Sequence, residues 1–213
     1  HPAAQSDNAT AQNAQKLASA TTTLDELQAA LASFEGCALK KTAKNTVFSD
    51  GVPEADIMII GEAPGQEEDR LGKPFVGKSG QLLDLMLASI GLSRKENLYI
   101  ANIIAWRPPG NRAPSVEEVA LCRPFIEHQI RLAQPKILLL VGGSAAKALL
   151  NTALGITRLR GKWHDYQASE SQDNEPTIPA LPLLHPAYIL RKPEAKADMW
   201  ADLCTLKSFM EKQ

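Results

Sequence analysis

Four short apolar runs divide the chain and predict buried strands. They are DIMIIG (56–61), LYIANII (98–104), KILLLVG (136–142) and LPLLH (181–185). None of them alternates apolar and polar residues, so we expect both faces of each strand to be covered. In an open sheet of such strands, functional sites form beyond the carboxyl ends. The loops that follow these runs are therefore the first candidates for a functional site.

Helical patterns separate the strands. Apolar residues recur at helical spacing after Ser79, after Ser115 and after Gly143, and further helices are expected at 24–33 and 195–212. Ser115 is a suitable N-cap for its helix. The alternation of strands and helices predicts an α/β fold with a parallel sheet, right-handed crossovers and helices on both faces.

The composition of the chain predicts where its domain begins and ends. The chain has 213 residues, 44% of them hydrophobic, which is enough for one well-buried core. Residues 1–23 are small and polar, so we predict a disordered tail there and a single domain at 24–213. Residues 167–180 are polar with two prolines, which indicates a surface loop before the last strand.

Charge and cysteine content suggest a compartment but no partner. No signal peptide and no apolar run of about 18 residues is present, so we expect a soluble, cytoplasmic protein that does not contact a membrane. Cys37, Cys122 and Cys204 are scattered, as suits a reducing compartment, and Cys204 is predicted to be a core residue. The net charge of −1 gives no general attraction to nucleic acid, so local charge must supply any such attraction.

The loop after the first strand run, GEAPGQEEDRLGKPFVG at 61–77, has the glycines of a phosphate loop but the wrong charge. It has neither a GK[ST] ending nor GxGxxG spacing, and its carboxylates would repel phosphate. A solvated acidic turn is one interpretation. Phe75, between glycines, is either a plug for the local core or a stacking platform for a planar ligand.

Polar residues also mark the second and fourth strand runs. Asn102 lies in a strand otherwise made of apolar residues, where it either ties loops together or reads the edge of a nucleobase. His185 ends a strand and precedes a proline, so it lies at the rim of the sheet as a structural residue or as a catalyst. Tyr188 and Ile189 follow it and could form a wedge.

Basic side chains gather in the same predicted rim loops. Loop arginines are normally just solvated, but together they could follow a DNA backbone. The candidate DNA-binding residues are Arg107, Arg112, Arg158, Arg160, Tyr188 and Arg191.

Four ordered motifs carry a resemblance to a known family. GEAPG with trailing acids, GKPFVGKSG, NIIAWRPPGNR and HPAY resemble the family 4 uracil-DNA glycosylases, from about Cys37 to Trp200. The resemblance implies a three-layer α/β/α sandwich around a four-stranded parallel sheet, in a single domain. It also implies a DNA repair enzyme that flips uracil out of single- or double-stranded DNA, hydrolyses the N-glycosidic bond and leaves an abasic site. We further expect a monofunctional, monomeric enzyme.

The resemblance also implies roles for the residues above. Ala63 belongs to the loop that holds water and base, Phe75 stacks on uracil, Asn102 reads its polar edge and His185 donates to its O2. Carboxylates suit the cationic sugar that forms as the bond breaks. The candidates for holding the water, in order of preference, are Glu62 and Glu68, followed by Gln66 and Asp69.

The chain departs from the family at the iron-sulfur cluster. Typical members hold the cluster with four cysteines, but here Phe34 and Trp106 stand where two of them are expected, leaving Cys37 and Cys122. Because a cubane cluster normally needs four thiolates, we predict no cluster and no metal. Phe34 and Trp106 are expected to fill the vacated volume as a small aromatic core.

Other functions remain open from the sequence. The same fold could remove hypoxanthine or xanthine, since Asn102 could accept either type of edge. The chain could also be a non-catalytic DNA-binding homologue that lost its activity together with the cluster. A phosphohydrolase that uses the acidic loop to hold Mg²⁺ is the weakest alternative.

Overall fold

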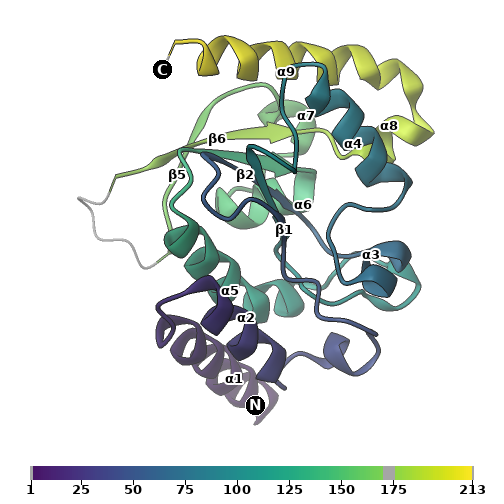
Figure 1. Ribbon diagram of the computed structural model, residues 1–213. Helices are drawn as coiled ribbons and strands as arrows, with labels where there is room; N and C mark the ends of the chain where they lie inside the picture. Colours follow the sequence, from purple (N-terminus) through teal and green to yellow (C-terminus); the bar gives the residue numbers. More distant parts are fainter. Residues whose placement is uncertain (1, 170–175, 213) are drawn as a thin grey trace.

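A six-stranded sheet forms the centre of the residues that the computed structural model describes, 2–169 and 176–212 (Figure 1). Its strand order is β1-β3-β2-β4-β6-β5. The strands are β1 (Asp50–Gly51), β2 (Ile57–Gly61), β3 (Leu98–Asn102), β4 (Ile137–Val141), β5 (His164–Tyr166) and β6 (Ile178–Leu183).

The four strands predicted from apolar runs are confirmed as the parallel centre of this sheet. Strands β3, β2, β4 and β6 pair in parallel, whereas β1 and β5 pair antiparallel at the two edges. The predicted number of four strands is therefore corrected to six. The edge strands span two and three residues and contain no apolar run, so the sequence pattern gave no signal for them.

Helices cover both faces of the sheet. The α-helices are α1 (Pro2–Ser19), α2 (Leu24–Ser33), α3 (Gln66–Leu71), α4 (Lys78–Ala88), α5 (Val116–Ala133), α6 (Gly143–Leu149), α7 (Ile156–Leu159), α8 (Pro186–Arg191) and α9 (Lys196–Met210). Short 3-10 turns are η1 (Ala38–Lys41), η2 (Pro109–Asn111) and η3 (Pro193–Ala195). Ser115 caps α5 as predicted, and it forms a reciprocal capping box with Glu118.

The core consists of two apolar layers, one on each side of the sheet. Met58 and Ile60 of β2 face the layer that contains residues of α1, α2, α5 and α6. Ile57 and Ile59 face the opposite layer, which contains residues of α4, α8 and α9. Figure 1 shows these two groups of helices on opposite sides of the sheet. The three-layer α/β/α sandwich and the coverage of both strand faces are thus confirmed.

The predicted disordered tail at 1–23 is corrected, because residues 2–19 form helix α1. Ala14 and Ala18 are fully buried, and α1 packs along α5. Alanine has the highest helix propensity, and its small side chain lets two helices approach closely. A composition argument that counts only large apolar residues misses this kind of packing.

Two smaller expectations also change. The surface loop predicted at 167–180 is shorter, because β6 begins at Ile178, where it pairs with β5; residues 170–175 lie outside the described residues. Cys204, predicted in the core, is exposed on α9. Among the described helices, none has the length and apolar character needed to cross a membrane.

Candidate active site

A pocket of about 650 Å³ opens at the carboxyl edge of the parallel strands. It collects residues from four segments that are far apart in sequence. The predicted site residues in its lining are Glu62, Ala63, Gln66, Glu68, Phe75, Asn102, Arg112, His185 and Arg191. The four motifs therefore meet at one place, as expected for the loops beyond the strands of an open α/β sheet.

Gly61, the last residue of β2, lies against two side chains that line the pocket. A Cβ atom at this position would lie 2.5 Å from Asn102 Oδ1 and 2.5 Å from Phe75 Cζ, which is closer than atoms can approach. Only glycine therefore lets the Phe75 ring and the Asn102 amide pack against the end of this strand. Asn102 is directly opposite Gly61 in the sheet register, so the pairing of β2 and β3 fixes its position.

The Asn102 side chain is an unusual buried polar group. Asn102 is 7% exposed and lines the pocket, yet no hydrogen bond to its amide occurs among the described residues. Buried amides in folded proteins nearly always have partners. An amide that keeps its donor and its acceptor free inside a pocket is suited to bind a ligand that offers the complementary pair.

His185 is oriented by its own backbone. It is the N-cap of α8, and its Nδ1 accepts a hydrogen bond from the backbone N–H of Ala187 at 3.1 Å. Because Nδ1 accepts, the proton of the neutral ring is on Nε2, which is left as a donor. The imidazole lies beside the Phe75 ring, with 5.9 Å between the ring centres and 32° between the planes.

The surroundings of His185 favour its neutral form. Burial lowers the pKa of His185 below its ordinary value of 6.5, and the positive charge of Arg191 lowers it further, while Glu68 opposes them. The ring is therefore a neutral donor at pH 7. Such a donor can stabilise negative charge that develops on a bound group, without itself carrying a charge into the pocket.

The acidic residues of the loop have different surroundings. The Glu62 carboxylate lines the pocket and makes no hydrogen bond or ion pair within the described part of the chain. Glu68 instead accepts two backbone hydrogen bonds through Oε1, from the N–H groups of Val76 and Gly77. Gln66 is exposed at the start of α3, where it too lines the pocket. Glu62 is thus the acid whose carboxylate remains available.

Asp69 does not reach the pocket. It is buried, and its Oδ1 accepts hydrogen bonds from the backbone N–H groups of Lys44 and Asn45 at 2.8 and 3.1 Å. The structure therefore gives it the role of fastening the turn at 44–45 to helix α3. Among the described residues, no group of three or more potential ligands could hold a metal ion, and Asp69 and Glu68 are both held by backbone amides.

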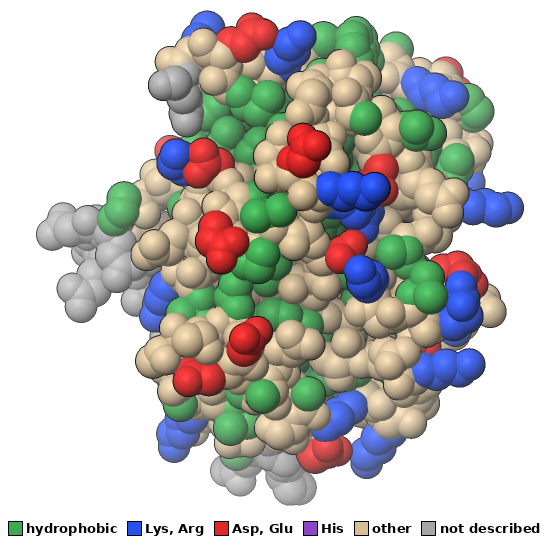
Figure 2. Space-filling view, viewed as in Figure 1, with side chains coloured by type: hydrophobic (Ala, Val, Ile, Leu, Met, Phe, Trp, Pro, Cys, Tyr) green, Lys and Arg blue, Asp and Glu red, His purple; other side chains and the backbone are tan. Residues whose placement is uncertain are grey.

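The predicted DNA-binding residues also differ in their positions and in their hydrogen-bond partners. Arg112 and Arg191 line the pocket, where Arg112 is paired in bidentate geometry with Glu118. Arg107, near the pocket, donates to Asn111. On the face in Figure 2, basic side chains are frequent toward the right-hand margin, where α3 and α8 lie in Figure 1, with acidic side chains among them.

Arg160 lies outside the pocket lining, in an ion pair with Asp202. Its guanidinium donates to both carboxylate oxygens, at 2.9 and 2.8 Å, and the Asp202 side chain is 4% exposed. Its neighbour Arg158 is exposed, and its guanidinium makes no hydrogen bond or ion pair within the described residues. The sequence offered no signal to distinguish the two arginines, because Asp202 is 42 residues away.

We expect Arg160→Met to lower the free energy of unfolding by about 3 kcal/mol, because it leaves the buried Asp202 carboxylate without its partner. Denaturant titration measures this loss. Arg158→Met is the matched control and should leave stability unchanged. Equal stability of the two variants would contradict the structural role of Arg160.

Of the two residues suggested as a wedge on helix α8, only Tyr188 is at the surface. Tyr188 and Leu190 are exposed, whereas Ile189, which the sequence suggested as part of a wedge, is fully buried. Successive residues of a helix are rotated by about 100°, so Ile189 turns into the core while Tyr188 and Leu190 stay at the surface. The sequence pattern missed this arrangement because no strand or helix was predicted at 186–191.

Arg94 is the residue near the site that sequence reasoning missed altogether. It lies between α4 and β3 and donates to the backbone carbonyls of Pro74 and Phe75 at 3.0 and 2.6 Å. Nothing local distinguishes it, since a charged residue in a turn is normally solvated. Its contacts are made with residues about 20 positions away and become visible only in the folded chain.

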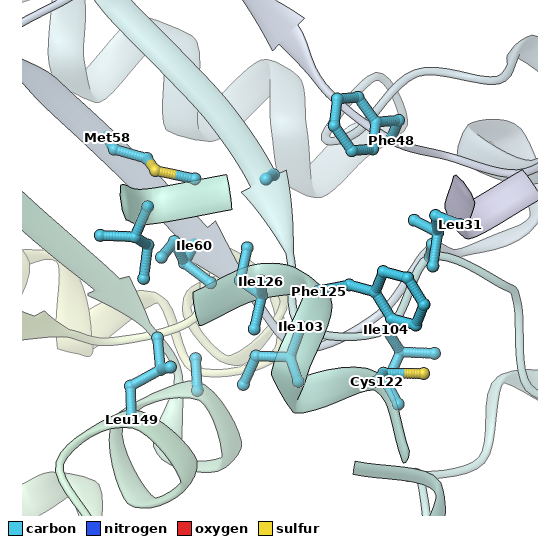
Figure 3. Close-up of a cluster of buried hydrophobic side chains, with 14 of the residues drawn as sticks. Leu31, Phe48, Met58, Ile60, Ile103, Ile104, Cys122, Phe125, Ile126 and Leu149 are labelled. Atoms are coloured by element: carbon cyan, nitrogen blue, oxygen red, sulfur yellow. The ribbon is translucent and has the colours of Figure 1, made fainter. Parts of the chain in front are cut away.

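The residues present do not fit an iron-sulfur cluster. Phe34 and Trp106 are buried, Phe34 packs on Phe125 with ring centres 5.3 Å apart, and Trp106 donates to Thr46. Cys122 lies beside Ile104 and Phe125 in the apolar cluster of Figure 3.

Only two thiols, Cys37 and Cys122, belong to this region, and they interact with each other. A hydrogen bond from Cys122 lowers the pKa of Cys37 to about 7, and the same bond raises that of Cys122. A cubane cluster normally has four thiolate ligands. Both thiols and the rings of Phe34 and Trp106 belong to one buried apolar cluster.

Comparison with known proteins shows the family of this chain. Residues 48–204 match the model of the Uracil DNA glycosylase superfamily. A Type-4 uracil-DNA glycosylase of Archaeoglobus fulgidus is 36% identical over 84% of this chain and 89% of its own length. One from Thermotoga maritima is 34% identical over 83% of this chain and 89% of its own length. The chain belongs to the uracil DNA glycosylase superfamily.

A relative of another kind is similar to this chain over one part of a larger protein. A DNA polymerase of Bacillus phage SP01 is 28% identical over 81% of this chain, but the match covers 18% of the polymerase. The matched unit therefore also occurs as one part of a much longer chain.

Proposed function

We propose that this protein is a monofunctional uracil-DNA glycosylase, which hydrolyses the N-glycosidic bond of uracil in DNA and leaves an abasic site. The observation that carries the proposal is the buried amide of Asn102, which has no hydrogen-bond partner among the described residues, together with the Phe75 ring and the Nε2 donor of His185. A flat ring, a paired donor and acceptor, and a second donor match the chemistry of a pyrimidine base. The family membership and the named relatives support the same activity.

Base binding requires the nucleotide to leave the DNA stack. The enzyme extrudes it into the pocket, where the Phe75 ring stacks on the base. The Asn102 amide then accepts from the N–H of uracil and donates to the neighbouring carbonyl, which satisfies the group that is unpaired in the free protein. Arg191 and Arg112, at the pocket rim, hold the flanking phosphates.

Bond cleavage places opposite charges at the two ends of the breaking bond. The departing uracil gains negative charge, which the Nε2–H of neutral His185 stabilises by donating to its carbonyl oxygen. The sugar becomes cationic, and the free carboxylate of Glu62 stabilises it and positions the attacking water. This division explains why an acidic loop and a neutral histidine line the same pocket.

The activity can be tested on matched oligonucleotides that each carry one uracil, hypoxanthine, xanthine or thymine. Strand cleavage after alkali reports an abasic site. We expect cleavage only at uracil, in both single- and double-stranded substrates. Cleavage at hypoxanthine or xanthine instead of uracil would assign another deaminated base, and binding without cleavage of any substrate would make the chain a non-catalytic DNA-binding homologue.

The proposal includes a protein that folds and acts as a monomer in the cytoplasm without an iron-sulfur cluster. We expect the protein, purified without oxygen from iron-supplemented cells, to show no visible absorption band and no bound iron, because two thiolates cannot replace four. Chelator treatment should leave uracil release unchanged. Stoichiometric iron in the purified protein, lost together with activity, would contradict this expectation.

A further inference from the structure

Phe75, which forms the stacking surface of the pocket, has an unfavourable backbone conformation. Its φ angle is +53°, in the left-handed region that residues with a bulky side chain rarely adopt. Such a conformation is strained and persists only where surrounding contacts impose it. The contacts that impose it here determine where the ring lies.

Arg94 binds the carbonyl groups on one side of this residue. Nη1 donates to Pro74 O and Nη2 donates to Phe75 O. The guanidinium is itself fixed by two carboxylates, Asp50 at 2.9 Å and Asp84 at 3.0 Å, and the side chain is 15% exposed. The planar fork of arginine can serve all of these acceptors at once, which the single ammonium of lysine cannot.

Glu68 binds the amide groups on the other side. Its Oε1 accepts from Val76 N at 2.9 Å and from Gly77 N at 2.8 Å. Gly80 leaves room for this arrangement, because a Cβ there would lie 1.9 Å from Phe75 O. Two carbonyls before the turn and two amides after it are thus bound by side chains of opposite charge from different parts of the fold.

We propose that Arg94 and Glu68 are positioning residues that hold Phe75 in the strained conformation required to stack on the flipped base. This inference rests on the proposed function. It gives Glu68 a role through hydrogen bonds that its Oε1 accepts, instead of a role in holding the catalytic water. With the ring placed in advance, binding of the base does not have to order the loop.

The test compares Arg94→Met, Glu68→Met and Glu68→Gln with wild type in steady-state uracil release. We expect Arg94→Met and Glu68→Met to lower kcat/KM by about 10–100-fold, mainly through KM, because a displaced ring positions the base poorly. Glu68→Gln retains an Oε1 acceptor and should stay within about 3-fold of wild type. Equal losses in Glu68→Gln and Glu68→Met would overturn the proposal.

Each substitution is then repeated in a Phe75→Ala background. If Arg94 acts through the ring, Arg94→Met should change the rate less than about 3-fold there, because coupled residues are not additive. The same loss in both backgrounds would overturn the proposal. Arg123→Met, which removes another partly buried arginine pair on α5, is the control for a general loss of stability.

Hydrogen exchange provides a readout that does not depend on activity. The amides of Val76 and Gly77 should lose protection in Glu68→Met and keep it in Glu68→Gln. Unchanged protection in Glu68→Met would overturn the proposal. An inactive wild type with this protection pattern would reject the proposed function while leaving the Glu68 contacts supported, so the two failures are distinguishable.

Discussion

His185→Ala is expected to slow the release of uracil by about 10²–10³-fold, with DNA binding nearly unchanged, because removal of one preorganised donor to a developing anion has this effect. Single-turnover kinetics on a uracil-containing oligonucleotide measures the rate, and a gel-shift titration measures binding. The substitution also removes the N-cap of α8.

His185→Asn separates these two roles. Asparagine is a good N-cap, so it should restore the start of α8, but its amide does not extend as far as Nε2. We therefore expect His185→Asn to regain thermal stability and to remain slow. Recovery of the rate together with stability would assign His185 a structural role only.

The pH dependence of the rate follows from the same residue. Because burial and Arg191 lower the pKa of His185, the neutral ring persists below pH 6.5, and the rate should fall only at more acidic pH. Protonation of Nδ1 removes the acceptor for Ala187 N–H and thereby disturbs the ring orientation. Rates measured from about pH 5 to about pH 8 would reveal this acidic limb of the pH–rate profile, where the rate falls. A limb at or above pH 6.5 would contradict the assignment.

Glu62→Gln is expected to lower the single-turnover rate by about 10²–10³-fold, because it removes the negative charge that faces the cationic sugar and holds the water. The glutamine keeps the shape of the side chain, so binding should change little. Glu68→Gln is the matched control in the same loop and should remain near wild type. If Glu68→Gln were the slow variant and Glu62→Gln the active one, the roles of the two acids would be exchanged.

Sequence reasoning was most successful where local patterns carry the structural signal. The four buried strands and the cap at Ser115 follow from apolar runs and from capping chemistry, and both were confirmed. Phe75, Asn102 and His185 were predicted to lie close together because sites in open α/β sheets form beyond the carboxyl ends of the strands. All three residues line the pocket.

Sequence reasoning could not resolve what depends on distant partners. Asp69 and Glu68 look equivalent to Glu62 in sequence, but backbone amides at 44–45 and 76–77 bind the first two, whereas the Glu62 carboxylate has no partner within the part of the chain that the structure describes. Arg94 shows the same limit, since its four acceptors come from three other segments. Helix α1 was missed for a different reason, because its buried face is made of alanines.

The most direct test of the central claim is the release of free uracil, detected by mass spectrometry, from a uracil-containing oligonucleotide in the presence of EDTA. Wild type and the Glu62→Gln/His185→Ala double variant, purified in parallel, distinguish this pocket from a contaminating enzyme. We predict that wild type releases uracil in proportion to abasic sites and that the double variant releases none above background. No release by wild type, or equal release by both proteins, would contradict the assignment of uracil excision to this pocket.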